Sequence, residues 1–296
     1  MMAITCEKER SPAQPGDREL AIIRDLLRTV SGIEVREGQE GLIASRLGGR
    51  LAACGLSLGE YLDRLGTGRD LEELGRMVDA LTTGHSTFFR HPAHFSRVVE
   101  HLAGRSGSQS TWEVWSAGCS SGEEPYSLAM AVADARAAGR PIAEGAILAT
   151  DISSSALESA KKGCFPASSA AGLEEETRRR HFDFTLSASS GLLRVGEAIR
   201  RAVRFETRNL VGAWHDEARF AAIFCRNVMI YFDPPSRRRL ISRLVDALEP
   251  GGLLCLSPVE SAGVDDPGLE TMAPAVFRKK RSSPWDDPGS LEGAGS

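Results

Sequence analysis

Long apolar runs are missing from this sequence. No stretch approaches the roughly 18 consecutive apolar residues that a bilayer-spanning helix needs, so we expect no insertion into a membrane. The first 16 residues, MMAITCEKERSPAQPG, hold no apolar core segment and do not predict a secretion signal. We expect residues 1–16 to be a disordered lead-in and residues 282–296, SSPWDDPGSLEGAGS, to be a disordered tail.

An excess of charge of one sign is missing too. The 36 Lys and Arg residues nearly balance the 40 Asp and Glu residues, and a net charge of −4 gives no reason to expect nucleic acid as a partner. The six cysteines form no CxxC pair, which argues against a zinc site or a disulfide framework and suits a reducing compartment. We therefore expect a cytoplasmic protein with one large or two ordinary globular domains.

Residues 17–83 have the periodicity of helices. In ELAIIRDLLRTVSGI the apolar residues Leu20, Ile23 and Leu27 recur every three or four positions. Glycines and short polar gaps then separate three more helical stretches, GLIASRLGGRLAACG, LGEYLDRLG and DLEELGRMVDALTTG. This pattern predicts a small all-helical N-terminal domain.

From about residue 110 the pattern changes to alternating strands and helices. Such alternation predicts a parallel sheet covered by helices on both faces. Residues 163–205 interrupt it with a charged helix, LEEETRRRHF, and two short strand-like pieces, so we expect an insertion there. We expect strands at 111–117, 146–150, 219–225, 252–257 and 275–280, and helices at 123–138, 153–162 and 234–249.

Small residues form the loop after the first predicted strand. In the stretch SAGCSSG, small side chains would let a ligand approach the backbone closely at the carboxyl end of a strand. Neither GxxxxGK[ST] nor GxGxxG is present, and the carboxylates of Glu123 and Glu124 would repel a pyrophosphate. A dinucleotide is therefore the weaker candidate for the ligand of this loop.

The next strand ends at Asp151, where an acidic residue can accept hydrogen bonds from both hydroxyls of a ribose. A nucleoside without pyrophosphate that carries a cationic amino-acid tail suits this loop and its carboxylates, and S-adenosylmethionine is such a ligand. An alternative is that Glu123 and Glu124 only complement the helix dipole, by about 0.3–1 kcal/mol each. The spacing alone leaves both interpretations open.

Four longer strings resemble one family. In order and spacing they are similar to the chemotaxis-receptor glutamate methyltransferases, the CheR family, over about residues 17–280. The strings are LTTGHSTFFRHPAHF (81–95), WSAGCSSGEEPYSLAM (115–130), LATDISSSALESAKKGCF (148–165) and IFCRNVMIYFDPPSRRRLISRLVDALEPGGLL (223–254).

The resemblance implies a fold and a reaction. The fold is α/β, a Rossmann-like class I methyltransferase domain (110–281) with a small β-subdomain insertion, preceded by the helical domain (17–83) and by a linker (84–109) over the cofactor site. The reaction is methyl transfer from S-adenosylmethionine to side-chain carboxylates of glutamates on the cytoplasmic helices of chemotaxis receptors. The product of the cofactor is S-adenosylhomocysteine.

The resemblance also assigns roles to residues of this chain. Arg90 and Tyr231 are expected nearest to the transferred methyl group, Glu124 at the methionine end of the cofactor, and Asp151 at its ribose. The full set of expected cofactor-binding residues is Gly84, Ser86, Arg90, Gly118, Glu124, Asp151, Asn209, Leu210, Asn227 and Val228, with Asn209 and Leu210 near the adenine.

The sequence departs from the family pattern at two positions. Gly84 stands where the family usually has Asn, which removes one side-chain contact from the linker, and Pro258 stands where it usually has His. His85, His91 and His94 cluster in the linker, but without a nearby Cys or a second acidic pair they predict no metal site.

The chemistry needs few catalytic groups. A glutamate side chain has an ordinary pKa of about 4.3, so it is already the nucleophile at neutral pH and needs no general base. Alignment and exclusion of water remain to be supplied. Arg90 can hold the incoming carboxylate through two hydrogen bonds, and the Tyr231 hydroxyl can orient it. The alternatives are that Arg90 caps a surface turn and that Tyr231 is a core residue.

The partner is the least specified part. Arg46 and Arg50 lie four residues apart on one predicted helix, and residues 41–59 include no acidic residue. We hypothesise that this basic stripe docks on acidic receptor helices, with an ordinary solvated face as the alternative. We expect a monomer. Rival functions are methylation of a non-chemotactic receptor or other acidic protein, and a cofactor-binding scaffold with little turnover.

Overall fold

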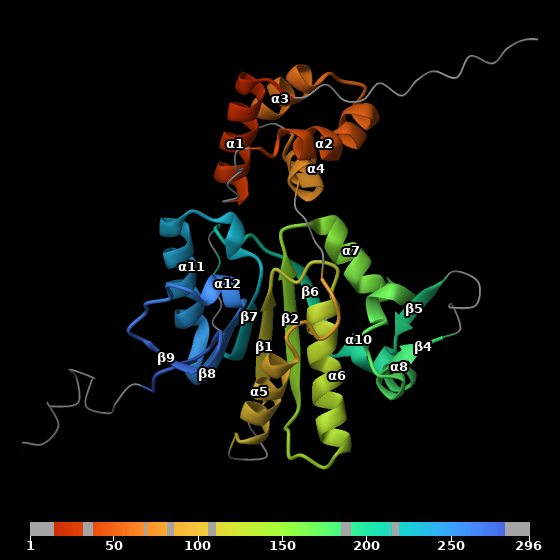
Figure 1. The fold of residues 1–296 in the computed structure, drawn as a ribbon, viewed down its shortest axis with the longest axis vertical. Coiled ribbons are helices and arrows are strands. Elements are labelled where there is room, and N and C mark those ends of the chain that lie inside the picture. The colour runs from red at the N-terminus through yellow and green to blue at the C-terminus, as the bar shows by residue number, and fades with distance from the viewer. Residues whose placement is uncertain are drawn as a thin grey trace, which may run out of the picture. The chain divides into compact units, whose positions relative to one another are not determined.

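Residues 15–31, 38–67, 70–81, 86–105, 111–184, 191–212, 214 and 219–281 are described by the structure, a computed structural model. The chain divides into two units, residues 1–83 and 84–296 (Figure 1). None of the described helices is both long and apolar enough to cross a bilayer.

The first unit is all-helical, as its periodicity predicts. Its helices are α1 (Asp17–Ser31), α2 (Glu40–Cys54), α3 (Leu58–Gly66) and α4 (Leu71–Leu81). Gly55 ends α2 in the left-handed conformation, and Ser57 and Glu60 then form a capping box that starts α3. The apolar faces meet in a small core that includes Ile23, Leu47 and Met77.

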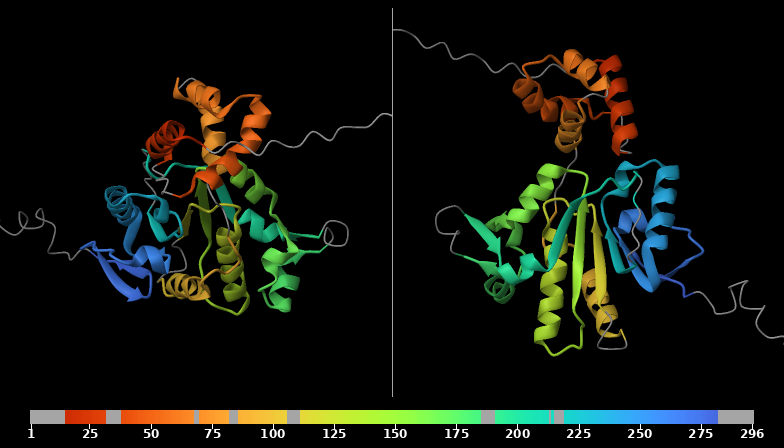
Figure 2. Two further views of the ribbon diagram at one scale, coloured as in Figure 1. Left: turned by 45° about the horizontal axis from the view of Figure 1, so that its top comes forward. Right: turned by 180° about the vertical axis from the view of Figure 1, so that it is seen from behind.

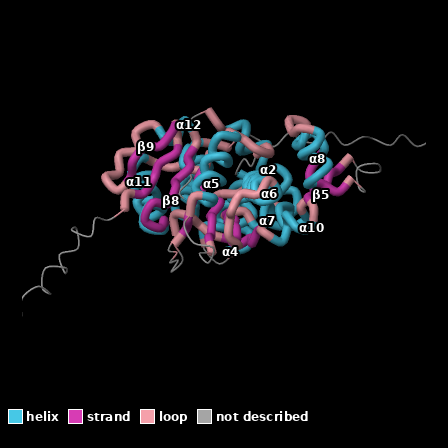
Figure 3. Tube along the Cα trace, turned by 90° about the horizontal axis from the view of Figure 1, so that it is seen from below, coloured by secondary structure: helices cyan, strands magenta, loops and turns pink. Residues whose placement is uncertain are grey.

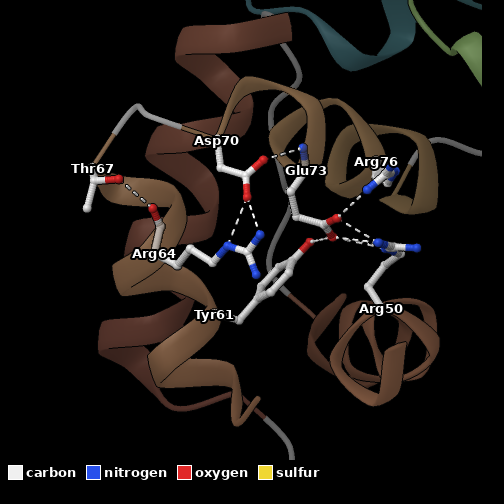
Figure 4. A network of polar contacts seen from close by, with 7 residues as sticks. All are labelled: Arg50, Tyr61, Arg64, Thr67, Asp70, Glu73 and Arg76. Carbon is white, nitrogen blue, oxygen red and sulfur yellow. Dashed lines mark hydrogen bonds and ion pairs between the residues drawn. The ribbon is translucent and has the colours of Figure 1, made fainter. Parts of the chain in front are cut away.

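A buried carboxylate joins three of these helices (Figure 4). Glu73 on α4 is 2% exposed. It accepts hydrogen bonds from the Arg50 guanidinium on α2, with the closest pair of atoms 2.6 Å apart, and from the Tyr61 hydroxyl on α3 at 2.9 Å. Arg76 adds an ion pair at 3.1 Å. Burial acts to raise the pKa of Glu73, but the hydrogen bonds from Arg50, Tyr61 and Arg76 outweigh it and the net pKa is lowered.

The two arginines of the hypothesised docking stripe therefore have partners inside the unit. Arg50 pairs with Glu73, and Arg46 donates to the carbonyl oxygen of Leu81 at 2.9 Å. Both guanidinium groups bind α4 to α2. The sequence of residues 41–59, which has no acidic residue, could not predict the Arg50–Glu73 pair, because Glu73 belongs to a later helix, α4.

The second unit is built on a seven-stranded sheet with the order β6-β2-β1-β7-β8-β10-β9 (Figure 1). Five neighbouring strands are parallel, which confirms the α/β prediction, but β10 runs antiparallel to both β8 and β9. The expectation of a parallel sheet is wrong at this edge, because short connections replace the crossover helix there. The strands are β1 (Trp112–Ala117), β2 (Gly145–Asp151), β6 (Val203–Thr207), β7 (Phe220–Cys225), β8 (Leu248–Leu256), β9 (Leu269–Ala273) and β10 (Val276–Lys279).

Helices cover both faces of the sheet. On one face, Val114 and Phe224 pack in a core with α5 (Pro92–Ala103), α6 (Glu123–Ala137) and α7 (Ser154–Lys162). On the other face, Trp115 and Ile223 pack with α11 (Pro234–Ala247). Strand β7 is buried along its whole length because it lies between these two layers. Helix α11 ends two residues earlier than expected, and β8 begins before the glycine pair.

Residues 84–109 were expected to be a linker over the cofactor site, and within them the structure forms helix α5 (Pro92–Ala103). Pro92 stands in the first turn of α5, where a missing N–H does no harm. Phe95, Val98 and Leu102 bury one face, and the Phe95 ring stacks on Phe224 with ring centres 5.3 Å apart. Of the described part of the linker, residues 86–91 precede the helix.

The insertion forms a separate small sheet with the order β3-β5-β4 (Figures 2 and 3). Strand β6, placed inside the expected 163–205 insertion, instead pairs with β2 in the large sheet, so the insertion ends before residue 203. Its elements are β3 (Cys164–Pro166), η1 (Ala167–Ala170), α8 (Glu175–His181), β4 (Phe182–Asp183), β5 (Leu192–Val195) and α10 (Glu197–Arg201). Figure 1 shows this lobe beyond the β6 edge, away from β9.

The Glu73 network generates a stability prediction. We expect Glu73→Gln to lower the free energy of unfolding of the helical unit by about 2–3 kcal/mol, because it removes the charge that Arg50, Tyr61 and Arg76 share. The lowered pKa also means that wild-type stability from Glu73 is present above its ordinary pKa of 4.5 and is lost as the pH falls toward the lowered value. The Gln variant should lack this loss.

Urea unfolding of the full chain can measure this effect. The four tryptophans all lie after residue 111, so their fluorescence reports on the second unit, whereas far-ultraviolet circular dichroism reports on both. The variant should shift the dichroism transition and leave the fluorescence transition in place. Asp63→Asn, an exposed change on α3, is the matched control and should stay within about 0.5 kcal/mol of wild type. Equal stabilities for the two variants would contradict the role of Glu73.

Candidate active site

Two loops meet at the carboxyl ends of β1 and β7. The strand order reverses between these strands, because β2 and β6 follow on one side and β8 on the other. Ligands of open α/β sheets bind at such a reversal. The loop after β1 contains Gly118, at φ +81°, and a Cβ atom there would lie 2.3 Å from Cγ2 of Val228 in the loop after β7. The structure thus brings Gly118 and Val228 together, and glycine is what lets them approach.

Backbone strain gathers around these loops. Of the five described non-glycine residues with positive φ, Ser120 lies in the first loop and Asn227 in the second, and Phe89 and His91 flank Arg90. Such conformations cost on the order of 1–3 kcal/mol each and persist only where the surroundings hold them. Four strained residues near one end of the sheet indicate a site whose backbone is held for function.

Asp151 holds the first loop from the end of β2. Its Oδ2 accepts a hydrogen bond from the backbone N–H of Ser120 at 2.8 Å, and its Oδ1 accepts one from Ser153 at 2.9 Å. The N–H groups of Gly118 and Cys119 both donate to the carbonyl oxygen of Thr150, at 2.7 and 2.9 Å. The carboxylate is therefore oriented at the carboxyl edge of the sheet, as its place in the sequence predicted.

Glu124 lies in the first turn of α6 and is 12% exposed. Its Oε1 accepts a hydrogen bond from the Ser116 hydroxyl at 2.6 Å, and its Oε2 lies 3.2 Å from Nη1 of Arg226. Burial raises the pKa of Glu124, and the positive charge of Arg226 opposes that rise. Glu123 turns elsewhere and accepts a hydrogen bond from Ser121 at 2.6 Å, so the two neighbouring carboxylates have different surroundings.

Arg226 is the residue that sequence reasoning missed. Its side chain is 2% exposed, and besides pairing with Glu124 it donates through Nη2 to the backbone carbonyl of Arg90 and lies over the Phe95 ring, 5.7 Å from the ring centre. One side chain thus joins β7, α6 and the segment before α5. The available signal was a charged residue directly after a strand of six buried residues, where a cation needs a buried partner.

The segment that carries Arg90 is anchored on both sides. The N–H of Phe89 donates to the Ser127 hydroxyl on α6 at 2.8 Å. The Phe88 ring meets Phe165 and Phe182 of the small sheet edge-on, with ring centres 4.9 and 5.2 Å apart. Arg90 itself is exposed. The backbone is therefore fixed while the guanidinium faces solvent.

The second loop is held in place by hydrogen bonds to the carboxylate of Glu260. This residue is 1% exposed and accepts hydrogen bonds at 2.7 Å from the N–H groups of both Asn227 and Met229. It belongs to α12 (Pro258–Ser261), which Ser257 starts with a capping box and Pro258 enters in its first turn. Pro258, a departure from the family pattern, is thus a good first residue for the helix that places Glu260.

The other residues expected at the site have fewer contacts with the two loops among those that the structure describes. Asn209 follows β6, and its Oδ1 accepts a hydrogen bond from the N–H of Val211 at 3.0 Å, while Leu210 is buried against the α11 face. Ser86 is half-buried at the start of the described segment. Tyr231 ends the short helix η2 (Met229–Tyr231) after the second loop, and Gly84 lies outside the described residues.

Comparison with known proteins gives the family. Residues 84–273 match the family model described as the SAM-binding domain of CheR methyltransferases, and residues 18–82 match the all-alpha domain of the same enzymes. The chain belongs to the CheR family. Its fold is accordingly an all-alpha domain followed by a Rossmann-like methyltransferase domain, and its cofactor is S-adenosylmethionine.

Curated relatives agree with this assignment. The chain is 35% identical over 240 residues to the chemotaxis protein methyltransferase of Salmonella typhimurium, covering 80% of this chain and 82% of the relative. The Escherichia coli protein of the same name is 34% identical over 240 residues, with 80% and 82% covered. Chemotaxis protein methyltransferase 1 of Pseudomonas aeruginosa is 36% identical over 252 residues, with 82% and 90% covered. This CheR chain is thus a methyltransferase of the chemotaxis class.

The residues at the carboxyl edge are chemically suited to this cofactor. Gly118 leaves room beside Val228, and carboxylates can accept hydrogen bonds from ribose hydroxyls and from an amino group. Asp151 and Glu124 supply carboxylates at two ends of the first loop, with Ser120 and Arg226 fixing their orientation. The donor set contains no basic side chain in the Gly118–Gly122 loop that would select a phosphate.

A matched pair of glycine variants tests this site. Gly118→Ala and Gly139→Ala both place an alanine at φ near +80°, which costs about 1–2 kcal/mol, but Gly139 has nothing within 4 Å of the new Cβ. We expect Gly118→Ala to weaken binding of S-adenosylhomocysteine at least tenfold by calorimetry, because the methyl group forces Val228 away. Gly139→Ala should bind like wild type, and equal affinities for both variants would contradict the site.

Proposed function

We propose that this CheR chain methylates glutamate side-chain carboxylates on the cytoplasmic region of chemotaxis receptors. The observation that carries the proposal is the presentation of Arg90: its backbone carbonyl is bound by the buried Arg226, its neighbour Phe89 is bound to α6, and its own side chain is exposed. An exposed guanidinium on a fixed backbone next to the cofactor loops suits an anionic acceptor. A carboxylate acceptor also needs no general base.

We also propose cofactor-binding roles, which membership of the CheR family implies and the positions of the residues support. We assign Asp151 to the ribose hydroxyls, Glu124 to the amino-acid end, and Asn209 with Leu210 to the adenine side. Gly118, Asn227 and Val228 would form the walls of the site, with Ser86 and Gly84 in the segment that leads to Arg90. When bound, S-adenosylmethionine supplies a methyl group activated by a positively charged sulfur.

The protein contributes alignment and exclusion of water. Arg90 would grip the substrate carboxylate through two hydrogen bonds and so direct one oxygen at the methyl carbon. This grip weakens as the ester forms and the carboxylate loses its charge, which helps the product leave. We assign Tyr231, which ends the short helix η2 three residues after Val228, to orienting the carboxylate through its hydroxyl.

The names of the curated relatives support a chemotaxis receptor as the substrate, since each is a chemotaxis protein methyltransferase. The proposal does not rest on docking through Arg46 and Arg50. Both arginines bind α4 within the helical unit, so a docking role would require them to leave Leu81 and Glu73.

Arg90→Ala tests the proposed reaction. Methyl-labelled cofactor is mixed with membranes that carry chemotaxis receptors from the same cell, and label in the receptor band is released as methanol by mild alkali. Alkali-labile label establishes a carboxyl methyl ester. We expect Arg90→Ala to lower the rate at least a hundredfold, because the carboxylate loses its positioning, with no change in melting temperature since the side chain is exposed.

Arg97→Ala is the control for this variant. Arg97 is an exposed arginine on the adjoining helix, paired at 3.2 Å with Glu100 one turn away, and its removal should leave the rate unchanged. Transfer by Arg90→Ala at the wild-type rate would overturn the mechanism. Cofactor binding without any transfer by the wild type would instead favour a scaffold with little turnover.

A further inference from the structure

A cavity lies at the amino end of the parallel strand β8, the end opposite to the candidate active site. It has a volume of about 730 Å³ and is lined by the end of α5, the start of β8 and the end of β10: His101, Gly104, Arg105, Glu249, Pro250, Gly251, Arg278 and Arg281. Strand β8 runs parallel to β1 and β7, so its start is far from their carboxyl ends, and antiparallel β10 brings Arg278 beside Leu253. We call it the α5–β8 cavity. It is separate from the candidate active site.

Positive charge converges in this cavity. Three of its lining residues are arginines and one, Glu249, is acidic. Burial and then the positive charges of Arg105, Arg278 and Arg281 together lower the pKa of His101 to about 4. All three guanidinium groups therefore act on one imidazole, which is neutral at physiological pH.

The acidic side chains nearby offset part of this charge. Glu249 forms an ion pair with Arg105, and Glu270 lies 3.5 Å from Arg278. The lining arginines alone still exceed the lining carboxylate by two charges. Gly251, at φ +85°, leaves the space beside Arg281 open, since a Cβ atom there would lie 3.2 Å from the Arg281 Nε.

Two buried nitrogen atoms of the described cavity wall make no hydrogen bond. Within the described residues, Nε2 of His101 and Nε of Arg105 are buried and have no hydrogen-bond partner. The His101 imidazole already bonds to the carbonyl of Ala221, which holds the ring in place. Its Nε2 lies 4.0 Å from Glu249, beyond hydrogen-bond reach. An imidazole that donates through one nitrogen presents the other as an acceptor, suited to a hydroxyl.

We propose that the α5–β8 cavity is a binding site for a small phosphate-bearing ligand. The planar forks of the arginines match phosphate oxygens, with Arg278 and Arg281 less constrained than Arg105, which Glu249 holds. The volume lies within the usual range of about 300–1,000 Å³ for small-molecule sites. The neutral Nε2 of His101 suits a hydroxyl on the same ligand.

The test uses the full chain with inorganic pyrophosphate as the probe. Saturating S-adenosylhomocysteine is present throughout, so that binding at the cofactor site does not contribute, and sodium chloride keeps the ionic strength constant. Calorimetry should detect pyrophosphate binding by the wild type. The double variant Arg278→Gln, Arg281→Gln should bind at least about tenfold more weakly, because each substitution removes charge-assisted hydrogen bonds.

Arg97→Gln is the matched control, since it removes one exposed arginine from α5 away from the cavity. It should bind pyrophosphate like the wild type. An unchanged melting temperature and S-adenosylhomocysteine affinity would show that the double variant is folded. If it is not folded, pyrophosphate binding is measured with a His101→Gln variant instead. No binding by the wild type, or equal binding by the double variant and Arg97→Gln, would overturn the proposal.

Discussion

The arrangement of the candidate active site depends on one buried ion pair, Arg226 with Glu124. The arginine follows a fully buried strand and the glutamate opens a buried helix, so neither charge has easy access to water. An isolated charge in such a place costs several kcal/mol, and here each charge has its counterion and one further hydrogen bond, from the Ser116 hydroxyl to Glu124 and from Arg226 to the carbonyl of Arg90. Through these bonds the position of Arg90 depends on the end of β7.

Carboxylates have two structural roles at the carboxyl ends of these strands: some accept hydrogen bonds from backbone N–H groups, and one pairs with a cation. Glu260 and Asp151 accept backbone N–H groups and hold residues 227, 229, 120 and 153 in place. Glu124 instead faces a cation and carries a pKa raised by burial. The strained residues Ser120 and Asn227 keep their conformations because their backbone N–H groups are hydrogen-bonded to the carboxylates of Asp151 and Glu260. The shape of the site thus comes from buried acids more than from the loops themselves.

Much of the fold could be predicted from periodicity and turns, because apolar spacing in the helical unit and the alternation after residue 110 are local signals. The antiparallel edge of β10 and the membership of β6 in the large sheet could not, since strand pairing is a long-range property that a short segment does not express. Helix α5 was missed although Phe95, Val98 and Leu102 have helical spacing, because the motif around Arg90 led us to interpret the whole segment as a linker.

Gly118, Glu124 and Asp151 were found through their place after strands. Arg226 was not, because its role appears only when its three partners are brought together.

The end of α4 and the boundary at residue 84 have a consequence for how this enzyme is put together. Arg90 lies after that boundary, and α5, which follows it, is part of the core of the second unit. Every residue assigned here to the chemistry, Gly84 through Tyr231, therefore belongs to one folding unit. The helical unit, α1 to α4, therefore supplies none of the residues proposed for cofactor binding or methyl transfer.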